Sequence, residues 1–219
     1  GVSARGTYAG VVEKIPYLKD LGITAVELMP VTEFDEIMMS SSGSSFHNAK
    51  QEPTGYVNYW GYGPSYLYAV KTAYASRETM SAEGEFKTLV RELHKAGIEC
   101  IPEMYFTGKE LPGEILSVLR YWVEEYHVDG FHLTGFPDLS LAAEDPFLKW
   151  TKLFAENWND VMNRRPKQGY VTLGDGAVSV EEKNLAEYNM QFMEDMRRFL
   201  KGDEGMLSAF ELRNRRNPM

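Results

Sequence analysis

Two carboxylates stand where an enzyme could use them, at the ends of predicted strands. Glu103 lies in a run over residues 98–106 that is typical of a buried strand, and Asp175 follows a shorter predicted strand over residues 169–173. A carboxyl group at such a place can act as an acid, a base or a nucleophile. It can equally be a hydrogen-bonded structural group. Glu103 and Asp175 are therefore candidate catalytic residues, with both interpretations open.

His132 is a third candidate, in a predicted strand over residues 128–134. A histidine there can serve as a general base or contact a ligand, although a lone histidine in a strand is more commonly packed and hydrogen-bonded. The sequence has no glycine-rich nucleotide-binding motif, no G-x-S-x-G elbow and no cluster with the spacing of metal ligands. It therefore predicts no nucleotide or metal cofactor.

An aromatic block between residues 56 and 68 points to a different kind of chemistry. It contains Tyr56, Tyr59, Trp60, Tyr62, Tyr66 and Tyr68. Sugar rings have apolar C–H faces that stack on such side chains, so Tyr59, Trp60 and Tyr62 are candidate sugar contacts. The alternative is a small hydrophobic cluster beneath a long loop.

These residues need a scaffold, and the chain alternates helical and extended patterns. Helices are expected over residues 8–21, 83–96, 114–126, 146–163 and 181–200, and strands over 23–29, 98–106, 128–134 and 169–173. Strands that alternate with helices favour a parallel α/β sheet. Both a doubly wound sheet and part of a (β/α)8 barrel fit. A whole barrel takes about 250 residues and eight strands, so four βα units would be an incomplete TIM barrel.

Length and charge narrow the class of protein. The 219 residues suit one domain, 1–219, with a long aromatic loop at 30–81. The net charge of −9 argues against nucleic acid or an anionic membrane as partner. No apolar run approaches the roughly 20 residues of a membrane span. The single cysteine, Cys100, excludes an internal disulfide and favours a reducing, cytoplasmic location.

Several segments, in order along nearly the whole chain, resemble the α-amylase superfamily of glycoside hydrolases. The similarity is greatest to its bacterial isoamylase and glycogen-debranching members, and it rests on residues 5–10 (RGTYAG), 21–31 (LGITAVELMPV), 58–62 (NYWGY), 119–131 and 197–210. The resemblance implies a catalytic (β/α)8 barrel that acts on α-glucans such as glycogen or starch. The four predicted strands would be the family's second to fifth, and Tyr62 would match a tyrosine that stacks on the sugar at the cleavage point.

The chain departs from the family pattern at the chemical positions. Where the family has Gly-Phe-Arg-x-Asp after its fourth strand, this chain has His132 for the arginine and Thr134 for the nucleophilic aspartate. At the family's fifth strand, which matches residues 169–173, Gly174 takes the place of the acid/base glutamate, and Asp175 fits only after a shift of one residue. Retaining glycosidases need two carboxyl groups about 5–5.5 Å apart. The sequence thus predicts an α-glucan-binding pseudoenzyme or fragment of the family.

Two other interpretations stay open. One is an active glycosidase in which Glu103 or Asp175 acts as a displaced carboxylate together with an aspartate outside this chain. The other is a structural role, since a fold does not determine a function. An arc of four parallel strands also leaves unpaired edges, through which two copies of the chain could form a homodimer.

Overall fold

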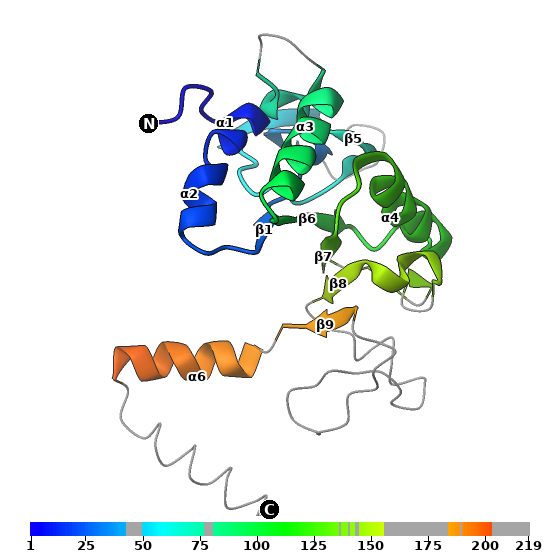
Figure 1. The fold of residues 1–219 in the computed structure, drawn as a ribbon. Helices are drawn as coiled ribbons and strands as arrows, with labels where there is room; N and C mark the ends of the chain where they lie inside the picture. Colours follow the sequence, from blue (N-terminus) through cyan, green and yellow to red (C-terminus); the bar gives the residue numbers. More distant parts are fainter. Residues whose placement is uncertain are drawn as a thin grey trace, which may run out of the picture.

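Five parallel strands form the central sheet of the computed structural model, in the order β1-β6-β7-β8-β9 (Figure 1). The strands are β1 (Ala25–Leu28), β6 (Glu99–Phe106), β7 (Gly130–Gly135), β8 (Lys152–Ala155) and β9 (Leu185–Glu187). The structure describes residues 1–42, 50–76, 81–135, 137–139, 141–142, 145–155, 184–188 and 190–202. The predicted parallel α/β architecture is confirmed.

Helices accompany the strands in the alternation that the sequence predicts. They are α1 (Tyr8–Val12), α2 (Ile15–Asp20), α3 (Ala82–Lys95), α4 (Pro112–Tyr126) and α6 (Met190–Lys201), with the short 3-10 helices η1 (Thr72–Tyr74) and η3 (Phe147–Trp150). The hydroxyl of Ser81 accepts a hydrogen bond from the backbone N–H of Gly84 and so caps α3. Helix α4 ends where His127 turns into the left-handed conformation, at φ 56°. Among the described residues, no helix has the length and apolarity to span a membrane.

The two faces of β6 and β7 have different surroundings, because side chains alternate along a strand. Met104 and Phe106 of β6, with Phe131 and Leu133 of β7, are buried in the hydrophobic core beneath the helices. That core includes Trp122 of α4, whose indole N–H donates to the Leu67 carbonyl at 2.7 Å. Packing on this face leaves the opposite face of the strands for polar residues.

Residues 30–81, expected to form an irregular loop, contain two antiparallel strand pairs. In the first, β2 (Thr32–Phe34) pairs with β5 (Ser65–Val70), and in the second, β3 (Ile37–Ser42) pairs with β4 (Lys50–Val57). The pairs join segments up to 38 residues apart. Local sequence periodicity carries little information about such pairing.

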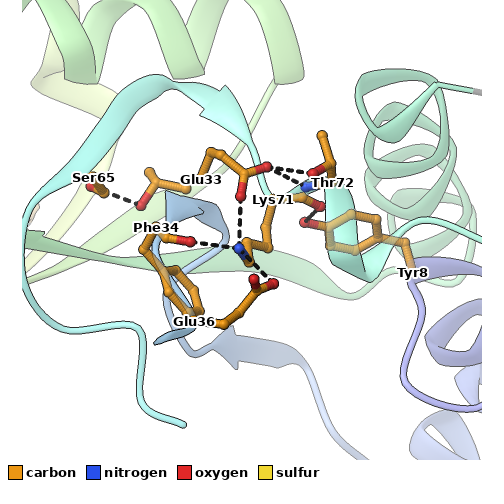
Figure 2. Close-up of polar contacts among 8 residues, drawn as sticks. Tyr8, Glu33, Phe34, Glu36, Ser65, Lys71 and Thr72 are labelled. Carbon is orange, nitrogen blue, oxygen red and sulfur yellow. Dashed lines mark hydrogen bonds and ion pairs between the residues drawn. The ribbon is translucent and has the colours of Figure 1, made fainter. Parts of the chain in front are cut away.

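The buried Lys71, which follows β5, contacts residues in and just after β2 and so stabilises the β2–β5 strand pair (Figure 2). Lys71 is only 1% exposed, and its ammonium lies 2.6 Å from a Glu33 oxygen and 2.8 Å from a Glu36 oxygen. It also donates to the Phe34 carbonyl at 2.6 Å and lies over the Phe34 ring. Burial alone would raise the pKa of Glu33, but hydrogen bonds from Lys71 and Thr72 outweigh burial and lower that pKa. The network holds the segment that leads to the aromatic block.

Three predicted helices are wrong in part. The expected helix 146–163 begins as the 3-10 helix η3 and continues as strand β8, and the expected helix 181–200 contains strand β9 before α6. Phe147, Trp150 and Phe154 have the spacing of a helical face, but Phe154 lies in strand β8 and Trp150 is 87% exposed, so these three residues form no buried helical face. The helix expected over residues 8–21 is two short helices, α1 and α2. The predicted strand 169–173 lies outside the described residues.

Candidate functional site

The polar face of β6 and β7 brings two of the predicted residues together. In the parallel register Glu103 pairs with His132, and Tyr105 pairs with Thr134. The Thr134 hydroxyl donates a hydrogen bond to a Glu103 carboxylate oxygen at 3.0 Å. Both side chains are buried, with Glu103 only 4% exposed. The hydroxyl at the position predicted for a nucleophile is therefore engaged by a neighbouring carboxylate.

His132 belongs to a second polar cluster, which joins three strands of the sheet. A hydrogen bond of 2.7 Å links its Nδ1 to Glu27 on β1, and the Tyr188 hydroxyl donates to the other Glu27 oxygen at 2.9 Å. The rings of His132 and Tyr188 lie 4.6 Å apart. His132 Nε2 is buried and has no hydrogen-bond partner among the described residues. Glu27 fixes the orientation of the imidazole.

The aromatic block forms an ordered surface, held by a tight turn. Asn58 donates from its side-chain amide to the Tyr62 carbonyl at 2.9 Å and accepts from the Gly61 N–H at 3.0 Å. Gly61 is required here, because its φ is 77° and a Cβ would lie 2.7 Å from the Phe34 ring. The turn leaves Tyr59, Trp60 and Tyr62 exposed, with Trp60 57% exposed. These three rings therefore lie at the surface of the protein and not in a buried hydrophobic cluster.

Three rings of this region lie nearly parallel. Trp60 and Tyr62 have centroids 6.5 Å apart and an interplanar angle of 18°. Tyr62 and Tyr105 have centroids 5.1 Å apart and an angle of 25°. Tyr105 comes from β6, on the same strand face as Glu103, so the aromatic surface reaches the end of the sheet where Thr134 lies.

One cavity is a separate feature from this polar face. It has a volume of about 850 Å³ and a mostly apolar lining from the N-terminal helices, β1 and the β2 region, including Tyr8, Leu18, Leu28 and Phe34. Glu103, His132 and Thr134 do not line it. Within the described part of the chain, no group of three or more His, Cys, Asp and Glu residues could hold a metal ion.

The structure therefore brings Glu103, His132 and Thr134 to one polar face, next to Tyr62. Asp175 lies outside the described residues. Neither Tyr105 nor Tyr188 is among the candidate residues that the sequence indicates. The signal for Tyr105 was its place two residues after Glu103, which puts the two side chains on the same face of a strand.

Comparison with protein families supports the resemblance. The family model "Alpha amylase, catalytic domain" matches residues 2–106. Isoamylase 3, chloroplastic, from Oryza sativa subsp. japonica is 30% identical over 282 aligned positions, which cover 96% of this chain and 33% of that protein. The glycogen operon protein GlgX homolog of Haemophilus influenzae is 30% identical over 268 positions, covering 94% and 37%. The chain thus spans about a third of the length of these relatives.

Solved structures show the same fold. Pullulanase type I from Bacillus subtilis str. 168, complexed with maltose, superposes with a TM-score of 0.59 at 21% identity, over 89% of this chain and 34% of the pullulanase. The pullulanase of Paenibacillus barengoltzii in complex with maltohexaose and alpha-cyclodextrin gives 0.58 at 15% identity, over 90% and 37%. The five parallel strands correspond to part of such a barrel.

Proposed function

Because this chain belongs to the α-amylase family, in its isoamylase and glycogen-debranching branch, we propose that it binds α-glucans on its aromatic surface and does not hydrolyse them. The apolar faces of glucose units would stack on Trp60 and Tyr59, which project from the Asn58 turn. The hydroxyls at the edges of the glucose rings would remain in water.

The proposal that this chain does not hydrolyse α-glucans rests on the Thr134–Glu103 hydrogen bond. A threonine hydroxyl is a weak nucleophile unless a base removes its proton as the oxygen attacks the sugar carbon. Glu103 accepts a hydrogen bond from this hydroxyl. It pairs with His132, however, two residues before Thr134, and so lies farther from the end of the strands. At 4% exposure, the Glu103 carboxylate has little access to a sugar carbon.

Strand β8 changes the assignment of the second catalytic position. It pairs with β7, and we take it as the counterpart of the family's fifth strand; the residue that follows it in the sequence is Glu156 rather than Gly174. Asn157 and Trp158 come next, close to the family's Glu-Pro-Trp pattern. We therefore propose Glu156, in place of Asp175, as the counterpart of the family's acid/base. One carboxylate of the pair would then remain, and the nucleophile would be the missing member.

A displaced-nucleophile glycosidase is the second candidate function. It is favoured by the 3.0 Å contact, which brings the Glu103 carboxylate beside the position of the missing aspartate. Hydrolysis of maltoheptaose or pullulan that disappears in Glu103→Gln would establish it. Turnover that the Glu103→Gln change leaves intact would exclude this form of the mechanism.

Trp60→Ala is expected to weaken binding of maltoheptaose about tenfold, because it removes the exposed stacking ring of the turn. Isothermal titration calorimetry measures the change directly. Trp150→Ala is the matched control, since Trp150 is more exposed than Trp60 but lies on η3, and its affinity should equal that of the wild type. Equal losses in the two variants, or no binding of the wild type at millimolar sugar, would contradict a sugar surface at Trp60.

Two further expectations remain predictions. The cysteine usage favours a cytoplasmic protein, and a second copy of the chain could pair along β1 or β9, which are the outer strands of the five-stranded sheet among the described residues. Light scattering tests the pairing, for which a monomer at all concentrations would be the contrary result.

A further inference from the structure

The gap between Tyr62 and Tyr105 is too narrow for a sugar. Carbon atoms in contact stand about 3.5–4 Å apart, so two aromatic rings with a sugar ring between them need about 7–8 Å. The centroids of Tyr62 and Tyr105 are 5.1 Å apart, and the rings are inclined by only 25°. Tyr105 therefore covers one face of Tyr62 with a direct stacking contact.

Tyr105 also reaches across the end of β7. It is the register partner of Thr134, and a Cβ built on the next residue, Gly135, would come within 3.1 Å of Tyr105 Cε2. Gly135 has a φ of 82°, which a glycine adopts without strain. The absence of a side chain at residue 135 thus gives the Tyr105 ring the space it occupies beside Thr134.

From these contacts we propose that Tyr105 closes the sugar subsite between Tyr62 and Thr134, so that α-glucans bind only on the outer surface at Trp60 and Tyr59. The proposal rests on the proposed glucan-binding function and adds a specificity-determining residue to it. A protein with the inner subsite closed has few contacts for a short oligosaccharide and depends on longer chains that spread over exposed rings.

The test compares maltotriose and maltoheptaose affinities by isothermal titration calorimetry in the wild type and in Tyr105→Val. Valine keeps the strand propensity of this position but removes the ring. Removing the ring should tighten maltotriose binding about five- to tenfold, because the face of Tyr62 that Tyr105 covers in the wild type becomes available for stacking. Tyr105→Phe keeps the ring and should bind as the wild type does.

A double variant separates the subsite from unrelated effects. If the sugar stacks on Tyr62, the gain in Tyr105→Val disappears in Tyr105→Val/Tyr62→Ala, and it survives in Tyr105→Val/Tyr66→Ala, because Tyr66 is an exposed tyrosine outside the ring stack. If the wild type binds maltoheptaose but Tyr105→Val gains no affinity for maltotriose, the closure is wrong and the proposed function stands. If no variant binds either sugar, the proposed function fails as well.

Discussion

Replacing Lys71 with methionine is expected to lower the free energy of unfolding by about 3 kcal/mol. The change removes the cation that Glu33, Glu36 and the Phe34 carbonyl share, and it leaves their oxygens facing an apolar side chain. Urea unfolding followed by far-UV circular dichroism gives the difference. Lys87→Met is the control, because the Lys87–Glu125 pair is half exposed and such pairs contribute about 0–1 kcal/mol. Similar losses in both variants would contradict a special role for Lys71.

The Lys71 effect should also depend on pH. Hydrogen bonds from Lys71 and Thr72 lower the pKa of Glu33 in the folded protein, in spite of burial, which opposes this shift. A carboxyl whose pKa is lower in the folded state stabilises the fold above its unfolded value of about 4, and that contribution is lost as the pH falls through the folded value. The difference between wild type and Lys71→Met should therefore narrow below about pH 4. A difference that stays constant down to pH 2 would contradict this assignment.

Gly135→Ala is expected to be at least as damaging, with a loss of about 3–5 kcal/mol or failure to fold. A Cβ at residue 135 would lie 2.1 Å from the Phe106 carbonyl oxygen, and the φ of 82° is unfavourable for alanine. Because the obstacle is backbone, no side-chain rotation relieves it. Thermal unfolding measures the loss.

Gly113→Ala provides the comparison for Gly135→Ala. Gly113 lies in α4, and a Cβ there meets nothing within 4 Å. Alanine should stabilise the helix by up to about 1 kcal/mol. If Gly135→Ala were as stable to heat as Gly113→Ala, this result would contradict the close approach of β6 and β7 at Gly135.

The strongly periodic elements could be predicted from the sequence. Helix α3 and strands β6 and β7 lie within a few residues of the expected ranges, because α3 is a long amphipathic helix followed by Gly97 and the two strands are largely apolar runs. Strand β8 could not, since its four residues follow Trp150 at a spacing that also suits a helix. These residues form a strand because they pair with β7, and this pairing depends on the rest of the sheet.

The candidate site was predictable to a similar degree. The expectation that strand ends meet brought Glu103 and Thr134 into one region, and the structure shows them hydrogen-bonded. The contact between Tyr62 and Tyr105 joins residues 43 positions apart and depends on the space left by Gly135. Periodicity contains no signal for such a contact. The strand expected over 169–173 and Asp175 lie outside the described residues, so the acid/base assignment to Glu156 stays a proposal.

The most direct test of the central claim combines binding and turnover in one sample. Maltoheptaose is titrated into the protein at millimolar concentration, incubated for a day, and analysed for shorter sugars by chromatography. We expect heat of binding and an intact heptasaccharide, both unchanged in Glu103→Gln. Release of glucose or maltose by the wild type that is lost in Glu103→Gln would contradict the claim.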